Sequence, residues 1–417
     1  MISPIVNAEE LSNLYLETRQ QSIAIVEPLS DEELNMQSFD DASPPKWHLA
    51  HTTWFFETLL LSKFSDEYKL FDESFTYLFN SYYETVGTFH PRTKRGLLVR
   101  PRIAEVMAYR KHVDDAMVHC IQTISKDKPE LLDICYIGIQ HEQQHQELLY
   151  MDIKHNLFSI PSLPSYLDKA IIVSGEKSDS SWLKIGEGIY TIGADADNFA
   201  YDNEFGQHKV YLEGSMLSSH LSSNGEFLDF VKDGAYQKAS LWLSEAWAHI
   251  NKEKMNKPYY WQEIHGEWFE FTLHGLQPLD LNAPVSHISY FEADAFARWS
   301  NARLPTEFEW EALAKQDQKE GVFHNNTILH PYTDDNKKSL LGNLWQWTSS
   351  SYAPYPRFRA ESGALGEYNG KFMCNQYVLR GGSFATPRQH IRASYRNFFP
   401  SHSNWMFSGV RLAKDEQ

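Results

Sequence analysis

The stretch HEQQHQE at residues 141–147 places two histidines, His141 and His145, four residues apart. On a helix, at about 100° per residue, the second imidazole lies only about 40° around the axis from the first. Paired imidazoles on one face suit a metal ion, and HExxH is the helical zinc signature of metallopeptidases, in which the glutamate, here Glu142, is the general base. The pattern therefore indicates metal chemistry and leaves the metal and the reaction open.

A second segment supplies a third candidate ligand. PPKWHLAHTTWFFE, at residues 44–57, has an apolar stripe at helical spacing that contains one histidine: Trp47, His51, Trp54 and Phe55. The histidine pair interrupts a similar stripe, and an imidazole buried without a partner is costly. A bundle whose stripes face each other would bring His51, His141 and His145 together. His48, about 60° from His51, is a competing ligand, although it lies at the edge of the stripe.

Each histidine also has an ordinary structural interpretation as a core residue with a partner, and for His51 alone that interpretation is the commoner one. Three neutral imidazoles would leave up to three open positions on an octahedral ion. This set is similar to the facial triads of non-haem iron(II), with histidine in place of the usual carboxylate. Tetrahedral zinc with a water ligand is the alternative on ligand type alone.

The peptidase interpretation lacks a third ligand. The longer metzincin motif requires glycine and histidine where this chain has Leu148 and Met151. A thermolysin-like site would take a glutamate from a following helix, but Glu176 lies in a segment that is broken by proline and serine. HExxH is therefore a weak indicator of proteolysis here, and Glu142 is expected to be a carboxylate on the flank of its helix.

Hydrophobic spacing predicts four helices in the first part of the chain: one after the N-cap Asn7, one from Pro44–Pro45, one over about 103–124 and one over about 130–157. They favour an antiparallel four-helix bundle. The connection at about 67–100 is too long for a bundle turn, which indicates a functional loop.

Prolines and serines then mark a linker, so we expect domains at 1–160 and 183–417 joined by residues 161–182. Short apolar runs broken by glycine predict a loop-rich α+β second domain with little regular secondary structure. One helix start is clear in it, because Thr306 and Glu309 form a capping box.

Composition narrows the partners and the compartment. The net charge of −17 over 417 residues argues against a nucleic-acid partner. The three cysteines, Cys120, Cys135 and Cys374, form no CxxC, which favours a reducing cytoplasm. We find no signal peptide and no apolar run long enough to span a membrane, so no membrane partner is expected. The sequence does not indicate the oligomeric state.

Several motifs together carry a resemblance to a known family. PPKWHLAHTTWFFE, FNSYYETVGTFHPRTKRGLLVRP and HEQQHQE resemble the DinB-type bundle of the hercynine oxygenases, the iron-dependent sulfoxide synthases of ergothioneine biosynthesis. The second half resembles the C-type-lectin-like, formylglycine-generating-enzyme (sulfatase-modifying factor) domain that these synthases carry, through YDNEFGQHKV, ISYFEADAFARWSNARLPTEFEWEALA, GNLWQWTSS, RGGSF and SGVRL. The similarity covers nearly the whole chain.

The resemblance implies roles for the metal and hercynine sites. Iron(II) would be bound by His51, His141 and His145, and Gln144 matches the glutamine that hydrogen-bonds the substrate imidazole. The patch that faces the trimethylammonium group is matched by Asn397, Phe398 and Phe399. Aromatic faces suit this group because a quaternary ammonium has no hydrogen to donate. Without the resemblance, Gln144 would be a solvated amide and the two phenylalanines core residues.

The resemblance also implies a thiol site and a proton donor. Arg92 and Arg95 match the arginines that bind the thiol's carboxylate, for which a planar guanidinium is suited. Tyr82 and Tyr83 match tyrosines that one branch of the family places near iron, where a phenol can donate a proton to reduced oxygen. Another branch takes this tyrosine from the second domain. Trp47 is expected to line the substrate site.

Two departures from the family patterns refine the expected activity. The cysteine pair with which formylglycine-generating enzymes bind copper is missing, with only Cys374 nearby, so that activity is not expected. Phe399 and Ser403 stand where the branch that uses γ-glutamylcysteine has an acidic residue and an arginine, which favours free cysteine as the thiol. GNLWQWT is a candidate for a structural calcium ion.

The resemblance thus implies an O2-dependent enzyme that joins cysteine or γ-glutamylcysteine to C2 of the imidazole of hercynine and oxygenates the sulfur, in a cleft between the domains. The nearest alternative is a related enzyme that forms carbon–sulfur or carbon–selenium bonds, of the selenoneine or ovothiol type. The more distant alternatives are a zinc metallopeptidase and a bundle that binds a metal or partner without catalysis.

Overall fold

The computed structural model describes residues 7–123, 125, 127–168, 171, 174–175, 181–195, 198–317, 321–334, 339–360 and 363–416. The chain divides into two compact units. The first contains the described residues up to 166 together with those of 196–202 and 360–368, and the second contains the rest of the described chain. No helix among the described residues is long and apolar enough to cross a membrane.

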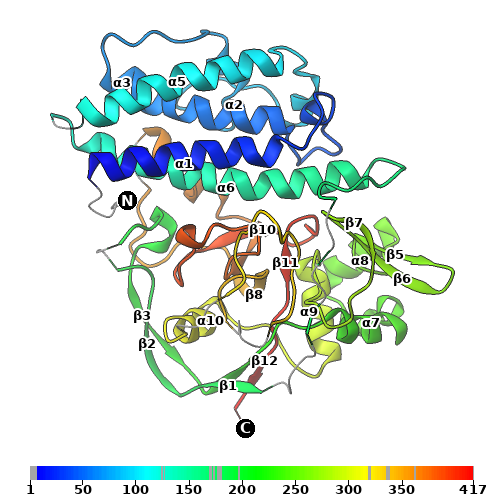
Figure 1. Cartoon of the computed structure of the whole chain (residues 1–417). Coiled ribbons are helices and arrows are strands. Elements are labelled where there is room, and N and C mark those ends of the chain that lie inside the picture. The colour runs from blue at the N-terminus through cyan, green and yellow to red at the C-terminus, as the bar shows by residue number, and fades with distance from the viewer. Residues whose placement is uncertain are drawn as a thin grey trace. The chain divides into compact units, whose positions relative to one another are not determined.

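Four long helices dominate the first unit and run side by side (Figure 1): α1 (Ala8–Val26), α2 (Pro45–Phe56), α5 (Ile103–Thr123) and α6 (Glu130–Phe158). They confirm the four helices predicted from hydrophobic spacing. Asn7 caps α1 by accepting a hydrogen bond from the Glu10 backbone N–H at 2.9 Å. Shorter turns join them: η1 (Glu33–Asn35), the π-helical η2 (Glu57–Leu61), α3 (Ser62–Phe64), α4 (Phe75–Leu78) and η3 (Arg92–Leu97).

The side chains of α2 and α6 meet in antiparallel order. Ser43, just before α2, bonds to Asp152, and His48 lies against His145. Near the other end of α2, Phe56 covers Gly138, where a Cβ would approach the Phe56 ring to 2.4 Å. Since all residues of Pro45–Phe56 are buried, the predicted inward stripe is part of a helix that is enclosed on every side.

The second unit is built on four small sheets, with strand orders β1-β4-β12, β2-β3, β5-β6-β7 and β10-β9-β8-β11. The strands of the first three sheets are β1 (Trp182–Ile185), β2 (Gly188–Ile192), β3 (His208–Leu212), β4 (Ser215–Ser218), β5 (Trp261–Ile264), β6 (Glu267–Thr272), β7 (Gly275–Pro278) and β12 (Ala413–Asp415). The fourth sheet contains β8 (Trp345–Ser351), β9 (Gln376–Arg380), β10 (Asn397–Pro400) and β11 (Ser408–Gly409). The strand pairs are antiparallel except β8 with β11.

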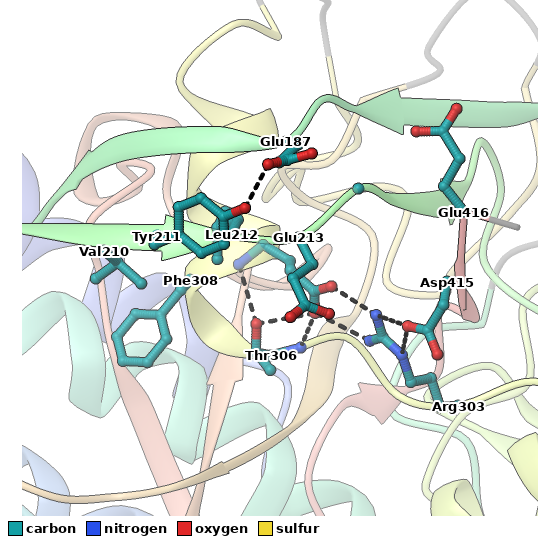
Figure 2. A pocket seen from close by; sticks show the side chains of 12 residues that line it. Glu187, Val210, Tyr211, Leu212, Glu213, Arg303, Thr306, Phe308, Asp415 and Glu416 are labelled. Carbon is teal, nitrogen blue, oxygen red and sulfur yellow. Dashed lines mark hydrogen bonds and ion pairs between the residues drawn. The ribbon is translucent and has the colours of Figure 1, made fainter.

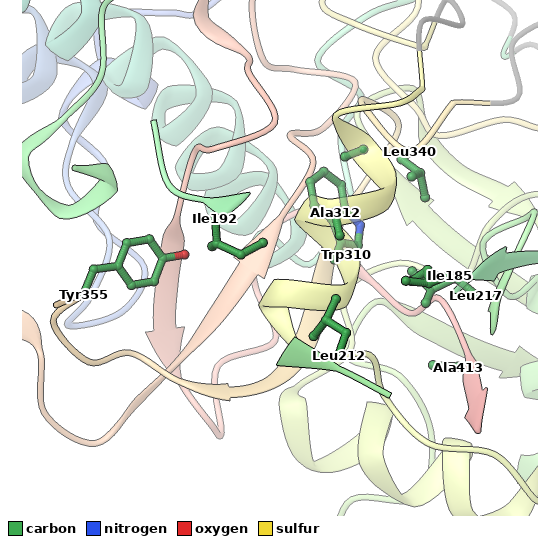
Figure 3. Close-up of a cluster of buried hydrophobic side chains, with 10 residues drawn as sticks. Ile185, Ile192, Leu212, Leu217, Trp310, Ala312, Leu340, Tyr355 and Ala413 are labelled. Atoms are coloured by element: carbon green, nitrogen blue, oxygen red, sulfur yellow. The ribbon is translucent and has the colours of Figure 1, made fainter. Parts of the chain in front are cut away.

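The α-helices of this unit are α7 (Asn224–Lys232), α8 (Ser244–Glu253), α9 (Tyr290–Trp299) and α10 (Glu307–Ala314). The predicted capping box is present at α10, where Thr306 and Glu309 bond reciprocally. Trp310 of α10 packs into a core with Ile185, Ile192, Leu212 and Leu340, as Figure 3 shows. An α+β fold with short strands therefore follows the helical unit, as the sequence predicts.

Candidate metal centre

Three imidazoles meet between α2 and α6. His51, His141 and His145 each offer a ligand atom, and these atoms lie within 4.8 Å of one another, as no other three His, Cys, Asp or Glu residues of the described chain do. The ring centroids are 5.1 Å apart for His51 and His141, 4.7 Å for His51 and His145, and 4.6 Å for His141 and His145. His51 and His141 are buried, while His145 is half-buried. The structure thus brings together the three histidines that the spacing placed inward.

Hydrogen bonds at Nδ1 of His51 and of His145 leave Nε2 of each ring free for a metal. His51 Nδ1 donates to the Phe79 carbonyl oxygen at 2.7 Å, so Nε2 keeps the lone pair. His145 Nδ1 lies 2.8 Å from His48 Nδ1, which again leaves Nε2. His141 Nδ1 is buried without a hydrogen-bond partner. A buried unsatisfied nitrogen is costly, so this donor set fits a metal ion better than it fits a set of core histidines.

Burial also keeps these rings in the ligand form. It lowers the pKa of His141 to about 3 and holds the pKa of His51 and of His145 well below the ordinary value, with the neighbouring imidazoles acting in the same direction. A metal ligand must be a neutral imidazole. The site therefore presents neutral nitrogens at physiological pH.

His48 is not a fourth ligand. Its Nε2 lies 2.9 Å from Asp152 Oδ2 and its Nδ1 faces His145 Nδ1, so both ring nitrogens are engaged. The ring stands behind His145 rather than at the edge of the stripe. Asp152 follows His145 by seven residues, which is about 20° short of two full helical turns. The two side chains therefore lie on the same face of α6, and this spacing could have identified Asp152 from the sequence.

Glu142 of the HExxH motif is a buried ion-pair residue, which corrects the expectation of a carboxylate on the helix flank. It is 0% exposed and accepts hydrogen bonds from Arg19 Nη1 at 2.8 Å, Ser22 Oγ at 2.6 Å and Arg110 Nη2 at 3.2 Å. Burial alone would raise the pKa of Glu142, but the two guanidiniums outweigh it and lower the pKa. A carboxylate with these three donors cannot serve as the general base of a peptidase.

Aromatic rings line the His51 side of the site. Trp47 stacks on His51 with centroids 4.6 Å apart, and Trp54 stacks on its other face at 5.6 Å. Tyr83 lies 5.4 Å from Trp54 and stacks against Tyr82 at 4.7 Å. Tyr83 is fully buried, and its side chain interacts with that of Tyr82. The two predicted tyrosines thus follow Trp54 outward from His51, and their role as proton donors stays a prediction.

The structure separates the two predicted arginines. Arg95 is 2% exposed and lies over the Trp47 ring, with its guanidinium carbon 3.4 Å from the ring centroid. Its amino groups donate to Ser43 Oγ at 2.8 Å and Ser81 Oγ at 3.1 Å, while Nε has no partner. Arg92, by contrast, is 51% exposed and 3.8 Å from Asp41. Its contact with a substrate carboxylate stays a prediction.

Gln144 meets residues that the motifs did not indicate. The Tyr368 hydroxyl donates to Gln144 Oε1, and the Tyr368 ring lies edge-on to His141 at 5.7 Å and stacks on Tyr201 at 5.2 Å. Glu367, its neighbour, accepts hydrogen bonds from the backbone N–H groups of Glu84 and Thr85, which follow the tyrosine pair. No sequence signal placed residues 367 and 368 against the bundle, because they lie more than 200 residues beyond α6.

The predicted aromatic patch lies in the second unit. Asn397, Phe398 and Phe399 form the half-buried strand β10. Phe398 stacks on Tyr352 at 4.1 Å, and the Asn397 side chain accepts a hydrogen bond from the Phe398 backbone N–H. The patch is therefore a half-buried group of aromatic rings, and its contact with a trimethylammonium group stays a prediction.

A separate pocket of the second unit contains no predicted site residue. Figure 2 shows its acidic lining, in which Arg303 already pairs with Glu309 at 2.6 Å and with Asp415 at 2.7 Å. Cys374 is exposed and free, and Cys120 and Cys135 are buried and free. In GNLWQWT, Asn343 uses both amide atoms on the Tyr332 backbone, so the calcium ion stays a prediction.

Residues 172–339 and 336–416 match the family model of the sulfatase-modifying factor enzyme 1-like domain. These segments cover more than half of the chain. The chain belongs to this family. Residues 14–149, which include most of the helical unit, match the DinB superfamily.

Curated relatives extend the comparison, two of them over nearly the whole chain. The chain is 27% identical to hercynine oxygenase of Mycolicibacterium smegmatis, over 99% of this chain and 100% of that protein. It is 26% identical to hercynine oxygenase of Mycolicibacterium thermoresistibile, over 97% and 95%. Ergothioneine biosynthesis protein 1 of Schizosaccharomyces pombe is 30% identical over 52% of this chain and 28% of that protein. The resemblance drawn from the motifs is confirmed.

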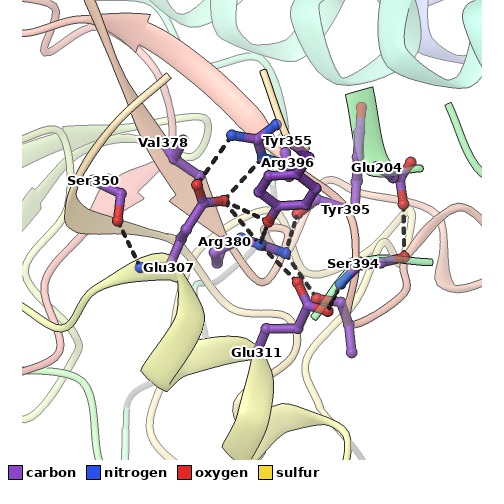
Figure 4. A network of polar contacts seen from close by, with 12 residues as sticks. Glu204, Glu307, Glu311, Ser350, Tyr355, Val378, Arg380, Ser394, Tyr395 and Arg396 are labelled. Atoms are coloured by element: carbon purple, nitrogen blue, oxygen red, sulfur yellow. Dashed lines mark hydrogen bonds and ion pairs between the residues drawn. The ribbon is translucent and has the colours of Figure 1, made fainter. Parts of the chain in front are cut away.

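Family motifs of the sulfatase-modifying-factor-like unit have structural roles. Arg380 of RGGSF donates to Glu307 at 2.9 Å and to Glu311 at 2.8 Å, in the buried network of Figure 4. Gln346 of GNLWQWT accepts hydrogen bonds from Trp310 Nε1 and from Arg411 Nε of SGVRL, each at 2.8 Å. These motifs hold the scaffold together.

Proposed function

We propose that this protein is an iron(II)- and O2-dependent sulfoxide synthase that joins a thiol to C2 of the imidazole of hercynine, in ergothioneine biosynthesis. The observation that carries the proposal is the three-histidine group, found in a chain that is similar over 99% of its length to a hercynine oxygenase. The substrates would be small molecules, namely hercynine, cysteine or γ-glutamylcysteine, and O2, without a nucleic-acid or membrane partner. A cytoplasmic location suits the free cysteines.

His51, His141 and His145 would hold the iron through neutral nitrogens, without a carboxylate. When bound, iron(II) would supply the oxidising chemistry with O2. His145 and Gln144 are the half-buried members of the HExxH segment. Substrate access on their side accords with the proposed hydrogen bond from Gln144 to the hercynine imidazole.

Arg95 is the best candidate for binding the carboxylate of the thiol substrate. Burial lowers the pKa of its guanidinium well below the ordinary value, an effect that nearby Arg92 increases. Its hydrogen-bond partners are two serine hydroxyls, and its Nε is unsatisfied. A carboxylate would supply the missing countercharge and acceptor. Stacking on Trp47 fixes the plane of the guanidinium, so this group is oriented before the substrate arrives.

Tyr82 and Tyr83 would deliver a proton to reduced oxygen. Burial raises the pKa of Tyr82 to about 12 and holds that of Tyr83 well above its ordinary value, so both phenols keep their proton at physiological pH. The two phenols interact with each other, so either could pass a proton on when oxygen and substrate are present. On the second unit, Asn397, Phe398 and Phe399 would receive the trimethylammonium group.

The other activities differ in what they predict. A zinc peptidase would need Glu142 as its base, and that carboxylate is held by Arg19, Arg110 and Ser22. A carbon–selenium or ovothiol-type enzyme would use the same metal centre with another donor or acceptor. We favour free cysteine as the thiol because Phe399 and Ser403 replace the acidic residue and the arginine of the γ-glutamylcysteine branch.

The test is oxygen consumption by the full chain loaded with iron(II) under anaerobic conditions, followed by mass spectrometry of the product. Hercynine would be paired in turn with cysteine, γ-glutamylcysteine and a selenol, and histidine would replace hercynine in a further reaction. We expect a hercynyl cysteine sulfoxide. If neither thiol gave a sulfur adduct, the proposal would be refuted. In His51→Ala, iron binding and turnover should both be lost, and survival of either would show that the third ligand is another residue.

A further inference from the structure

Asp152, His48 and His145 form a buried line of hydrogen bonds behind the metal centre. Asp152 Oδ2 lies 2.9 Å from His48 Nε2, and His48 Nδ1 lies 2.8 Å from His145 Nδ1. Asp152 is 2% exposed and His48 is 3% exposed. Asp152 and His48 are therefore shielded from water, and their hydrogen-bond partners are protein groups.

The proton positions along this line follow from the carboxylate. An ionised carboxylate only accepts hydrogen bonds, so His48 Nε2 carries a proton and donates it to Asp152. A neutral His48 then has its lone pair on Nδ1 and accepts a hydrogen bond from the Nδ1–H of His145. The remaining lone pair of His145 is on Nε2.

We propose that Asp152 and His48 are positioning residues that select the Nδ1–H tautomer of His145 and hold its Nε2 toward the metal. The inference rests on the metal centre of the proposed function but not on its substrates. Metal-binding histidines commonly donate their second N–H to a carboxylate or a carbonyl, and loss of that partner typically weakens metal binding about 10- to 100-fold. Here an imidazole stands between the ligand and the carboxylate.

The carboxylate is itself held in place. Asp152 Oδ2 also accepts a hydrogen bond from the Ser43 backbone N–H at 2.9 Å, and Ser43 Oγ accepts one from Arg95 at 2.8 Å. Ser43 precedes α2, so this bond ties the start of α2 to α6 beside the metal centre. Among the three candidate ligands, His51 is oriented by a backbone carbonyl and His141 Nδ1 has no partner. Of the three, His145 is thus the ligand whose orientation can be tested by substituting a side chain that supports it.

The test is an equilibrium titration of the full chain with Co(II), which reports both affinity and ligand geometry through its visible absorption. Asp152→Asn and His48→Leu should weaken Co(II) binding about 10- to 100-fold and alter the spectrum. His48→Gln should retain more affinity than His48→Leu, because its amide offers one donor and one acceptor. Glu57→Gln is the matched control, since Glu57 is a buried carboxylate of the same unit that bonds to Tyr68 and Tyr109.

Folding of each variant would be checked by circular dichroism, and if His48→Leu does not fold, Asp152→Asn decides alone. Wild-type affinity and spectrum in folded Asp152→Asn would overturn the inference, as would equal losses in Asp152→Asn and the Glu57→Gln control. Such results leave the proposed function untouched. Conversely, a chain that binds Co(II) as expected but forms no sulfur adduct with iron(II) would remove the proposed substrates and leave this inference standing.

Discussion

Replacing Glu142 by glutamine separates this metal centre from that of a peptidase. In a zinc peptidase the same substitution removes the general base, so activity disappears while the fold is unaffected. Here Glu142 lies between Arg19 and Arg110, whose side chains are each 3% exposed. Glu142→Gln keeps the size of the side chain but removes the negative charge. We therefore expect its main effect on the free energy of unfolding.

The size of the change in the free energy of unfolding follows from the ion pairs that the two guanidiniums lose. Arg19 keeps Asp114, 2.7 Å away, as a partner, whereas Glu142 is the one carboxylate that hydrogen-bonds to Arg110 within the described chain. Removing one partner of a buried ion pair costs about 3–5 kcal/mol. For a domain of 150–250 residues, each kcal/mol lowers Tm by roughly 2–4 °C, so the helical unit should melt roughly 6–20 °C lower.

The assay is thermal and urea unfolding followed by far-ultraviolet circular dichroism, with Glu17→Gln as the control. Glu17 is an exposed carboxylate on α1, near Arg19, and its substitution should change the free energy of unfolding by less than about 0.5 kcal/mol. The reasoning would be refuted if Glu142→Gln unfolded like the control. Loss of a peptidase activity from a variant of unchanged stability would instead identify a metallopeptidase.

The same ion pairs predict a pH dependence. Because the folded-state pKa of Glu142 lies below its ordinary value of 4.5, its stabilising contribution is complete above pH 4.5 and is lost as the pH falls through the folded-state pKa. The difference in free energy of unfolding between wild type and Glu142→Gln should therefore be constant near neutral pH and shrink in acid. A difference that grew in acid would contradict the assigned sign.

Three further substitutions test other parts of the site. Arg95→Met should raise the KM for the thiol by about 10- to 100-fold, because it removes a charge-assisted contact. Lys94→Met, on the exposed face of the same turn, should leave the KM unchanged, and steady-state kinetics would measure both values. Gly138→Ala forces a Cβ to within 2.4 Å of the Phe56 ring. The free energy of unfolding should therefore fall by about 1–3 kcal/mol, and a Co(II) titration should show weaker binding. Tyr83→Phe removes a buried hydroxyl that interacts with Tyr82, so mass spectrometry should show less sulfoxide while circular dichroism shows an unchanged fold.

Helical spacing was sufficient to predict much of the metal centre. His141 and His145 are one turn apart, and His51 lies on the neighbouring apolar stripe, so packing of α2 against α6 brings the three imidazoles together. The capping residues Asn7 and Thr306 were also identifiable, because their partners are only three residues away. Local chemistry of this kind depends on short separations along the chain.

Contacts between distant segments could not be predicted in this way. Arg19 precedes Glu142 by 123 residues, and neither residue signals the other, so the glutamate looked exposed. Tyr368 is 224 residues from Gln144. The family motifs contain Arg380 and Gln346, but the sequence does not show that both side chains make buried hydrogen bonds within the second unit. Which polar residues are buried, and with what partner, is decided by tertiary packing.

The π-helical turn Glu57–Leu61 lies between α2 and α3 and interrupts what would otherwise be one continuous helix. A π turn contains about one residue more than an α turn, so residues beyond it are rotated by about 100° relative to a continuous α-helix. Glu57 anchors the start of the turn through Tyr68 and Tyr109. The turn therefore sets the direction of the residues beyond 61 independently of the apolar stripe that contains His51. The loop that carries Tyr82, Tyr83 and Arg95 thus begins from a direction that an uninterrupted α-helix would not give it.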